Sequence, residues 1–572
     1  MELASRGVDV LVAESRRRGE PPSVKCNHVA ARSMEVFRRL GLVDRVRNAG
    51  LPPDYPHDVA FRVTTTGGDL SRIPIPCRRD RFSVSGGPDT DWLTPEPPHR
   101  INQIYLEPLM FEHAAAMDRV RILNRISVTG LQQEPDHVLA SAQDLDGSDP
   151  LQVRSQYVIG CEGARSLTRH LIGARFEGDA VVQRVQSTYL RAPDLIHRLT
   201  APAAWGTFSL NPHRSGVVYA IDGKEHWLVH NYLTDDEPSF EAVDRDASIR
   251  SIFGVDADFT YEVVSKEDWC GRRLVADRFR DRRLFICGDA AHIWVPFAGY
   301  GMNAGIADAV DLAWLLAAHL DGWGDARMLK AYEAERHPIT DQVSRFAMNH
   351  ALEVSRQRKA VSDEIEDPGP AGDAIREATG RAAYELNVQQ YCAAGLNFGY
   401  FYDASPIIAY DGAEHPGYTM GSFTESTVPG CRLPHLWLRD GRSLFDALGP
   451  AYTLLVFDSS LPTDALQRAA AARSVPLEVL HLDAAEDARH VYSHPLVLAR
   501  PDLHISWRGS EVPERPDELL DILSGRAAMR TSPQRRDGPQ GEDSPLSSGE
   551  PAVSSNTERA SRNASTPAGM PA

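Results

Sequence analysis

The chain has 572 residues, 42% of them hydrophobic and 24% charged, and its formal net charge is -18. This length exceeds what a single hydrophobic core supports, so we expect several domains. The diffuse acidic excess argues against binding to nucleic acid or to an anionic membrane surface.

The sequence also carries information on the cellular setting. No stretch is long and apolar enough to predict a transmembrane helix, and the first residues lack the basic-then-apolar order of a signal peptide. The seven cysteines are scattered and include no C-x-x-C pair. We therefore predict a reduced, cytoplasmic chain without a zinc site or any other bound metal.

The first predicted elements have an α/β pattern. Residues 1–6 are expected to be the last turn of a helix capped by Gly7, and residues 8–13 a buried strand of a parallel sheet. Helices over 29–47 and 104–118 follow, and residues 121–158 alternate as antiparallel strands do. Residues 1–180 are thus expected to form a first α/β domain.

The remaining elements divide the chain further. Strand-like runs over 181–275 predict a sheet-rich, substrate-binding domain inserted into the first one. A strand at 284–287, a long helix from about Gly301 and polar helices continue the first domain over 276–400. Strands at 453–457 and 496–499 belong to a C-terminal domain at 401–526, and residues 527–572 have the composition of a disordered tail.

The strongest motif is CGDAAHIWVPFAGYGMNAGIADAVDLAWLL, at residues 287–316. Asp289 ends a strand, where its carboxylate can meet a ligand hydroxyl, and Gly299, Gly301 and Gly305 allow backbone to approach a flat ligand. The helix N-terminus at 301–303 offers unpaired N–H groups and a positive dipole end, which suits a ring that carries negative charge. The alternative is a glycine-rich turn of no particular function.

This motif resembles the second FAD-binding motif of the class A flavoprotein monooxygenases of the para-hydroxybenzoate hydroxylase type, and the resemblance extends over residues 1 to about 525. It implies that residues 1–180 form most of a Rossmann-like FAD-binding domain, which continues over 276–400, and that Asp289 holds the ribityl chain of FAD. It also implies that Pro296 and the 299–303 backbone lie beside the isoalloxazine ring. The cofactor-binding positions of this loop are then Pro296, Gly301, Met302 and Asn303, and Pro296 and Gly299 position the flavin at the catalytic centre.

Two further motifs match the family. In YVIGCEGARSLTR (157–169), Glu162 stands where the family has an aspartate that serves FAD and the nicotinamide cofactor; the alternative is a surface pair with Arg169. Glu14 ends the first strand, where a carboxylate binds ribose hydroxyls in dinucleotide folds. The resemblance aligns Lys25 with a basic residue near the flavin phosphates and Gln103 with a glutamine beside FAD, although each is equally compatible with a surface role.

The resemblance implies an activity. It is that of an FAD-dependent monooxygenase, reduced by NADPH or NADH, which reacts with molecular oxygen to form a flavin C4a-hydroperoxide and hydroxylates a phenolic or polycyclic aromatic substrate, polyketides included. Strand alternation places Trp227 and Val229 opposite Leu228 and His230, without showing which face meets the ligand. The candidate pocket residues are aromatic: Trp205, His213, Tyr219, Trp227, His230, Tyr232 and Trp294.

Other activities stay open. The alternatives are a Baeyer–Villiger, epoxidising or antibiotic-inactivating flavin oxygenase, and a catalytically silent flavoprotein that acts as a binding partner. No G-x-G-x-x-G precedes the strand at 8–13, so we expect that the first strand and the phosphate-binding loop, about 20 residues in such a fold, are missing.

The C-terminal segment PGCRLPHLWLRDGRSL (429–444) resembles the start of the thioredoxin-like domain of phenol and polyketide hydroxylases. Thioredoxin chemistry needs two cysteines after the strand at 454–458, and Ser459-Ser460-Leu461 stand there instead. The domain is therefore predicted to be non-redox, either structural or a means of forming a homodimer, with Cys431 an inert thiol.

Overall fold

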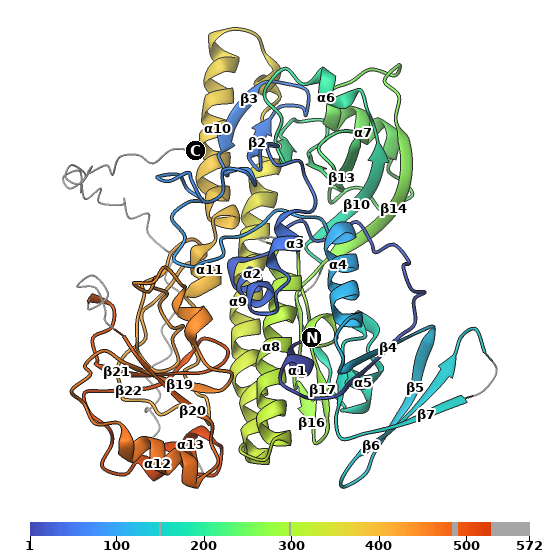
Figure 1. The fold of residues 1–572 in the computed structure, drawn as a ribbon. Coiled ribbons are helices and arrows are strands. Elements are labelled where there is room, and N and C mark those ends of the chain that lie inside the picture. Colours follow the sequence, from blue (N-terminus) through green and yellow to red (C-terminus); the bar gives the residue numbers. More distant parts are fainter. Residues whose placement is uncertain (148–149, 180, 297–298, 483–489, 528–572) are drawn as a thin grey trace, which may run out of the picture. The chain divides into compact units, whose positions relative to one another are not determined.

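The computed structural model describes residues 1–147, 150–179, 181–296, 299–482 and 490–527 (Figure 1). Beyond Ala527, the predicted disordered tail lies outside the described residues. No described helix combines the length and apolarity that crossing a membrane requires.

The chain opens with a parallel strand pair. After the short helix α1 (Glu2–Ser5), strand β1 (Val10–Glu14) pairs in parallel with β4 (Val120–Asn124). The prediction that this strand is buried is wrong, because its middle residues are exposed and β4 is its one partner among the described strands. Residues of β4 were predicted to pair antiparallel, which is wrong, because helix α4 (Gln103–Ala115) leads into β4 and carries the chain back so that both strands run the same way. The antiparallel pattern holds for the next three strands, β5 (Ile126–Gln133), β6 (Val138–Asp144) and β7 (Pro150–Ser155).

A second parallel pair lies in a separate small sheet. Strand β8 (Val158–Gly160) pairs with β17 (Leu284–Ile286), although more than a hundred residues separate them in sequence. Because parallel strands end at the same edge of a sheet, the turns that follow β8 and β17 are neighbours. This pairing brings two of the predicted motifs together.

The middle of the chain forms a seven-stranded sheet whose order is β14-β10-β13-β12-β11-β2-β3. Figure 1 shows β10, β13 and β14 side by side, with helix α7 (Arg245–Phe253) over them. The sheet takes in β2 and β3, from a region that the sequence analysis assigned to the first domain. The strands are β2 (Val59–Arg62), β3 (Asp69–Ile73), β10 (Gln183–Arg191), β11 (Gly206–Ser209), β12 (Gly216–Ala220), β13 (His226–Tyr232) and β14 (Glu262–Gly271).

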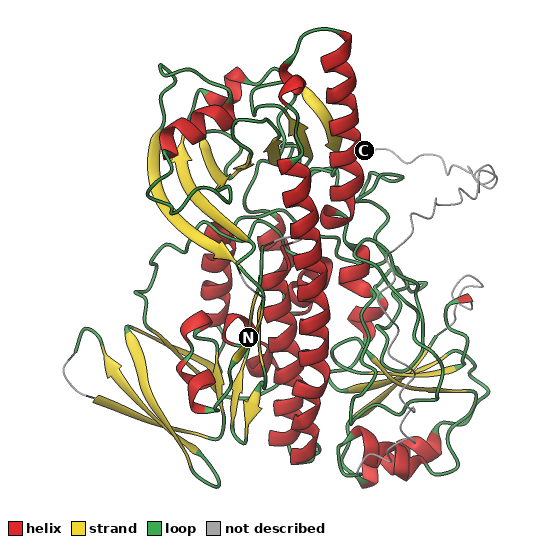
Figure 2. Ribbon diagram, turned by 180° about the vertical axis from the view of Figure 1, so that it is seen from behind, coloured by secondary structure: helices red, strands yellow, loops and turns green. Residues whose placement is uncertain are grey.

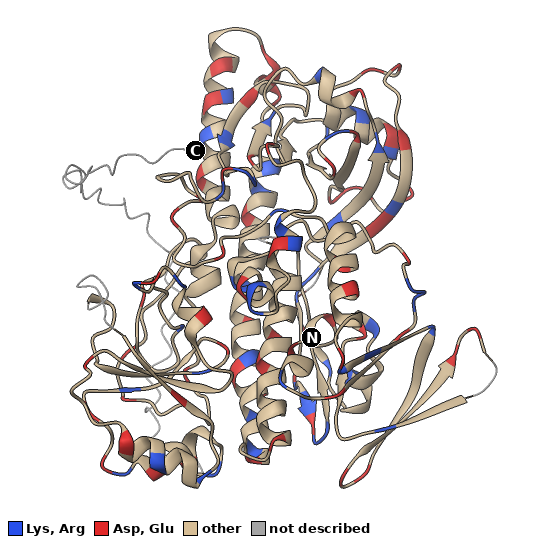
Figure 3. Ribbon diagram, in the orientation of Figure 1, with Lys and Arg blue, Asp and Glu red and all other residues tan. Residues whose placement is uncertain are grey.

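Three long helices, α8 (Tyr300–Leu320), α9 (Lys330–Lys359) and α10 (Pro370–Tyr391), follow the flavin loop (Figure 2). We use this name for the described residues 291–296 and 299. Acidic and basic residues alternate along α10 (Figure 3), and the Arg376–Asp373 ion pair, at 2.5 Å, is one of their contacts. Helix α8 is apolar and buried over most of its length, as its sequence predicts, so it fixes the flavin loop to the protein core.

The C-terminal region contains a four-stranded sheet of order β20-β19-β21-β22. Its one parallel pair, β19–β20, is linked by helix α12 (Asp464–Ala472), and this arrangement agrees with the expected thioredoxin-like domain. Burial raises the pKa of the Cys431 thiol to about 11, as expected for an inert thiol. The strands and last helix are β19 (Tyr452–Val456), β20 (Leu477–His481), β21 (Leu496–Ala499), β22 (Ile505–Gly509) and α13 (Pro516–Leu523).

Buried ion pairs join this C-terminal region to the helices before it. The Arg500 guanidinium makes two bonds, of 2.6 and 2.7 Å, to Glu335 of α9, and both side chains are fully buried. Arg432 makes two bonds, of 2.6 and 3.0 Å, to the buried Glu35 of helix α2 (Ala31–Arg39). Paired charges of this kind are costly to separate, so the C-terminal region is an integral part of the core.

Candidate active site

Two turns lie side by side at the carboxyl ends of β8 and β17. The turn at Gly163–Arg165 follows β8, and the turn at Gly288–Ala290, which contains Asp289, follows β17. The buried side chain of Arg169 donates hydrogen bonds to the carbonyl oxygens of Ala164 (2.8 Å) and Ala290 (3.1 Å). Arg169 thereby fastens the two turns together.

Glu162 is occupied by contacts within its own segment. Its carboxylate accepts hydrogen bonds from the Ser166 hydroxyl (2.7 Å) and the Thr168 amide (3.1 Å) at the start of helix α5 (Leu167–Leu171). Its hydrogen bonds involve no arginine, so the alternative of a solvated pair with Arg169 is wrong. A role of Glu162 toward the cofactor stays a prediction.

Asp289 is exposed and has no hydrogen-bond or ion-pair partner among the described residues. Burial raises the pKa of the nearby Cys26 thiol to about 11, and the negative charge of Asp289 adds to this effect. The backbone N–H of Gln103, at the start of α4, donates to the carbonyl oxygens of Lys25 (3.1 Å) and Cys26 (3.0 Å). Asp289, Cys26 and the beginning of α4 therefore lie close together. The Asp289 carboxylate is available there to bind a ligand hydroxyl.

Glu14 and Gln103 are linked through two residues that the sequence analysis missed. Glu14 accepts a 2.9 Å hydrogen bond from the Arg16 amide, the Arg16 guanidinium lies 2.6 Å from Glu107, and Gln103 donates to Glu107 at 3.1 Å. Burial acts to raise the pKa of Glu14, but the bonds from Arg16 outweigh it and leave the pKa below its usual value. Glu107 stands one helical turn after Gln103, a spacing that was visible in the sequence.

Lys25 has a different partner from the one expected. Its amine forms an ion pair with Glu267 of β14, so it links the first segment to the edge of the large sheet. Its predicted contact with the flavin phosphates stays a prediction.

The three glycines of the flavin-loop motif have different environments. Gly299 has a positive φ of 63° and accommodates His28, whose Cβ would lie 3.0 Å from an added Cβ. An added Cβ at Gly301 would meet nothing within 4 Å, whereas one at Gly305 would lie 3.2 Å from the Gly288 Cα. Gly301 therefore borders open space beside the α8 N-terminus, which fits a flat ring, and Gly305 serves close packing.

Asn303 holds the flavin loop in place. Its side-chain oxygen accepts hydrogen bonds from the Ala30 amide (2.9 Å) and the Ser33 hydroxyl (2.7 Å), and its amide donates to the Gly299 carbonyl (2.6 Å). Met302 packs, half-buried, against an apolar cluster. A ligand at this end of α8 would therefore meet its free backbone N–H groups rather than the Asn303 side chain.

A buried carboxylate behind the loop also escaped the sequence analysis. Asp308 accepts hydrogen bonds from the Gly288 amide (3.1 Å), His292 Nε2 (2.7 Å) and Arg336 Nε (2.9 Å). Burial opposes its ionisation, but His292 and Arg336 lower the pKa of Asp308 to about 2. Trp294, proposed as a pocket residue, is buried and stacks on His292 with ring centroids 4.7 Å apart.

The large sheet presents an aromatic face, which we define by Tyr219, His230, Tyr232 and Trp269. The rings of Tyr219 and His230 are 5.8 Å apart and those of His230 and Trp269 are 6.0 Å apart. Trp205 lies 5.0 Å from Tyr219, and Tyr391 of α10 closes the group at 6.0 Å from Trp205.

The two remaining candidate pocket residues lie elsewhere. Trp227 lies on the opposite side of the sheet and donates to the Ala192 carbonyl at 3.1 Å. His213 is exposed and lies 3.0 Å from Glu366. Strand alternation therefore predicted the two faces correctly.

The aromatic face reaches the flavin loop. An added Cβ on Gly271, next to the aromatic face, would lie 2.9 Å from a methyl carbon of Val295 and 3.3 Å from the Trp269 ring. At the other end of the loop, Gly299 contacts His28. An aromatic ligand held against this face would thus lie next to the same loop as the expected flavin ring.

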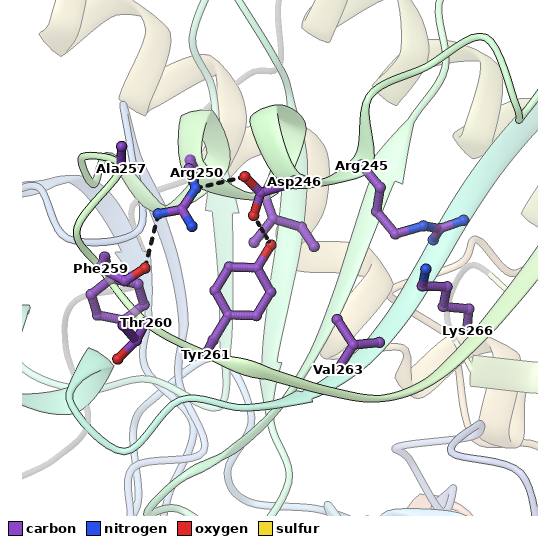
Figure 4. A pocket seen from close by; sticks show the side chains of 10 residues that line it. Arg245, Asp246, Arg250, Ala257, Phe259, Thr260, Tyr261, Val263 and Lys266 are labelled. Atoms are coloured by element: carbon purple, nitrogen blue, oxygen red, sulfur yellow. Dashed lines mark hydrogen bonds and ion pairs between the residues drawn. The ribbon is translucent and has the colours of Figure 1, made fainter.

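A pocket of about 420 Å³ lies away from this face, between α7 and β14 (Figure 4). Several of its polar groups bond one another: Asp246 bonds Arg250 at 2.8 Å and Tyr261 at 2.5 Å, and Arg250 donates to the Phe259 carbonyl at 2.9 Å. Because these groups satisfy one another, the pocket is a poor candidate for the aromatic ligand.

Comparisons with known proteins agree with this arrangement. A family model described as "FAD binding domain" matches residues 1–347, and one described as "Aromatic-ring hydroxylase, C-terminal" matches residues 426–527. Phenol 2-monooxygenase of Pseudomonas sp. (strain EST1001) is 26% identical over 92% of this chain and 90% of its own length. FAD-dependent monooxygenase opdD of Penicillium oxalicum is 28% identical over 86% of this chain and 97% of its own.

Solved structures match as well. RebC, a rebeccamycin biosynthetic enzyme whose structure was determined with reduced flavin, superposes with a TM-score of 0.81 at 32% identity, covering 92% of this chain and 96% of its own. The flavin-dependent monooxygenase PieE, in complex with FAD and substrate, superposes with a TM-score of 0.76 at 25% identity, covering 92% and 95%.

Proposed function

The chain belongs to the FAD-dependent aromatic-ring hydroxylases, and on that premise we propose that NADPH or NADH reduces its flavin and that a phenolic or polycyclic ring, polyketides included, is its substrate. One observation carries the proposal: the flavin loop directly follows the Asp289 turn in the chain, and its Val295 lies next to Gly271, beside the aromatic face. A cofactor ring and a substrate ring would therefore meet at this loop.

We propose the following roles for the chain's own residues. Asp289 and Glu14 bind ribityl and ribose hydroxyls, and the N–H groups at the start of α8 face the edge of the isoalloxazine ring. Bound FAD supplies the redox and oxygen chemistry, which the side chains do not. Asp308 and Arg169 hold the two turns rigid, so that the cofactor binds to a preformed surface.

Toward the substrate, the protein acts by positioning the ring and by excluding water from the site. The aromatic face offers rings that pack against a flat substrate, and all four of them are half-buried. Burial lowers the pKa of His28, beside the loop, well below its usual value, and Arg100 lowers it further, so His28 is neutral. We assign no side chain as acid or base.

The proposal also covers the domain organisation, the oligomeric state and the cellular location. We propose domains at 1–180, 181–275, 276–400 and 401–526, with β2 and β3 completing the substrate sheet, and a homodimer in the cytoplasm.

Substrate-dependent turnover tests the function. The chain, loaded with FAD, is given NADPH or NADH, isotopically labelled oxygen and a panel of phenols and polycyclic phenols. We expect one ring to accelerate nicotinamide oxidation and to gain one labelled oxygen atom. Oxidation that no ring accelerates, with hydrogen peroxide as the only product, would contradict the proposal.

A further inference from the structure

Two cysteines lie side by side where strands β8 and β17 end. The strands pair in parallel with Gly160 opposite Ile286, so Cys161 and Cys287 are the next residues in register. Cys287 keeps an extended conformation, and its N–H donates to the Gly160 carbonyl at 3.0 Å, which continues the ladder by one residue. Residues opposite each other on neighbouring strands point to the same face of a sheet, so both thiols lie on one side.

The two thiols are in contact and differ in exposure. A hydrogen bond joins the thiol of Cys161 to that of Cys287. Cys161 is exposed, whereas Cys287 is buried and its sulfur lies 3.1 Å from the Tyr332 hydroxyl. Neighbouring strands are about 4.8 Å apart, and a disulfide joins Cα atoms that are about 4.4–6.8 Å apart. The pair can therefore form a disulfide with little movement of the backbone.

The two thiols also differ in acidity. The hydrogen bond from Cys287 lowers the pKa of the Cys161 thiol, although desolvation and the negative charge of Glu162 oppose this effect. The same hydrogen bond, together with burial, raises the pKa of Cys287 well above its usual value. An exposed, more acidic thiol beside a buried one suits two successive reactions: the first thiol meets an oxidant, and the second then attacks the oxidised sulfur.

We infer that Cys161 is a modification site for hydrogen peroxide and that Cys287 converts its oxidised form into a disulfide. In the first step the Cys161 thiolate attacks the peroxide: an S–O bond forms, the O–O bond breaks, and the leaving hydroxide takes up a proton to give water. In the second step the Cys287 sulfur attacks the Cys161 sulfur: an S–S bond forms, the S–O bond breaks, and hydroxide leaves with the Cys287 proton as a second water. Two thiols lose two electrons, which reduce one peroxide to two waters.

The disulfide forms directly beneath the candidate cofactor site. Glu162 follows Cys161, and the turn that carries Asp289 follows Cys287. A disulfide bond of about 2.05 Å is shorter than a hydrogen bond between two sulfur atoms, so oxidation draws the two turns together. Because the cofactor needs both turns in their places, the oxidised chain binds FAD less tightly. Disulfides of cytoplasmic proteins are usually transient and often sense oxidants, which agrees with this reversible use of the pair.

Thiol counting on the full chain tests the inference. The reduced chain is treated with a small excess of hydrogen peroxide, and free thiols are then counted under denaturing conditions. The chain has seven cysteines and the disulfide uses two, so we expect five free thiols, and seven again after treatment with dithiothreitol. Peptide mass spectrometry should find Cys161 linked to Cys287. FAD titration should show affinity weakened by about 10-fold in the oxidised chain and restored by the reductant.

Single-cysteine variants separate this pair from general oxidation. Cys161→Ser should keep all its thiols, and its FAD affinity should not respond to peroxide. Cys287→Ser should stop after the first step, so that dimedone, which traps sulfenic acids, labels Cys161. Cys270→Ser removes the other exposed cysteine, which lies on β14, and this matched control should form the disulfide as the unaltered chain does.

Three results would overturn the inference: seven free thiols after peroxide treatment, a disulfide that joins other cysteines, or Cys161 oxidised to a sulfinic acid without any link to Cys287. A linked chain that binds FAD as tightly as the reduced chain would overturn the effect on the cofactor site and leave the modification site standing. The inference concerns the chain's own thiols and goes beyond the proposed function, so the identity of the aromatic substrate does not affect any of these results.

Discussion

The backbone amide of Gly288 donates a 3.1 Å hydrogen bond to the buried carboxylate of Asp308. Gly288 lies directly after a strand end and Asp308 lies two turns inside helix α8. This contact fixes the turn that carries Asp289 to the helix whose N-terminus faces the expected ring. Because Asp308 also bonds His292 and Arg336, three elements hold the flavin loop at its base.

Asp289→Ala should weaken FAD binding. The exposed carboxylate has no partner within the described residues, so its loss removes a ligand contact without breaking the fold. A charge-assisted hydrogen bond contributes about 1.5–3 kcal/mol, or one to two decades in the dissociation constant. FAD titration followed by flavin fluorescence measures this. Asp321→Ala, at the exposed end of α8, is the matched control, and an equal effect in both variants would remove Asp289 from the site.

Arg169→Gln should weaken both the fold and cofactor binding. The variant loses the charged donor to two carbonyl groups, and each such bond is worth about 1.5–3 kcal/mol. We expect a lower melting temperature and a lower FAD affinity, since the two turns are no longer joined. Arg165→Gln, an exposed arginine in the same segment, should change neither. An Arg169→Gln variant with normal FAD affinity would show that the junction is not needed for binding.

Gly301→Ala should separate stability from cofactor binding. Alanine in a helix is favoured over glycine by up to about 1 kcal/mol, and its Cβ would meet no atom within 4 Å. The chain without FAD should therefore melt at the same temperature or higher, while the methyl group occupies space that a flat ring needs. Parallel measurements of melting temperature and FAD affinity check this. Unchanged affinity would mean that the open space beside Gly301 does not receive the cofactor.

The free energy of unfolding of the Asp311→Asn variant should increase relative to that of the unaltered chain as pH rises. Burial raises the pKa of Asp311 to about 7, with Asp502 and Glu335 adding to the effect and Arg336, 3.5 Å away, opposing it. In the unfolded chain the carboxyl ionises near pH 4, so between about 4 and 7 ionisation favours the unfolded state. Asparagine keeps an acceptor for the Tyr402 hydroxyl.

Denaturant unfolding of both chains at several pH values measures the effect. The stability of the unaltered chain, relative to Asp311→Asn, should fall between pH 4 and 7 and level off above. Asp321→Asn supplies the control for an exposed aspartate. A stability difference between the two chains that does not change with pH would contradict a raised pKa in the folded protein.

Local pattern was enough to predict where several candidate residues stand in the fold. Asp289 follows strand β17, Glu14 ends strand β1 and Gly299 precedes helix α8, so a few neighbouring residues determine their places. Alternation along β13 likewise separated Trp227 from His230. It did not show which face meets the ligand, because that depends on Tyr391, which arrives from a helix more than a hundred residues later.

Long-range pairing accounts for what the sequence analysis missed. The parallel partner of β4 and the inclusion of β2 in the large sheet follow from strand pairing between distant segments. The role of Asp308 depends on Arg336 of another helix. Neither periodicity nor spacing within one segment contains this information.

The ion pairs that Arg432 and Arg500 make with Glu35 and Glu335 limit how this chain can be recombined. A chimera that takes everything from residue 426 onward from a relative would replace both arginines while keeping both acids. If the donor lacks them, two buried carboxylates lose their partners, each at about 3–5 kcal/mol, enough to unfold a typical domain. Exchange of catalytic and C-terminal parts between relatives is therefore expected to succeed only where these four positions are inherited together.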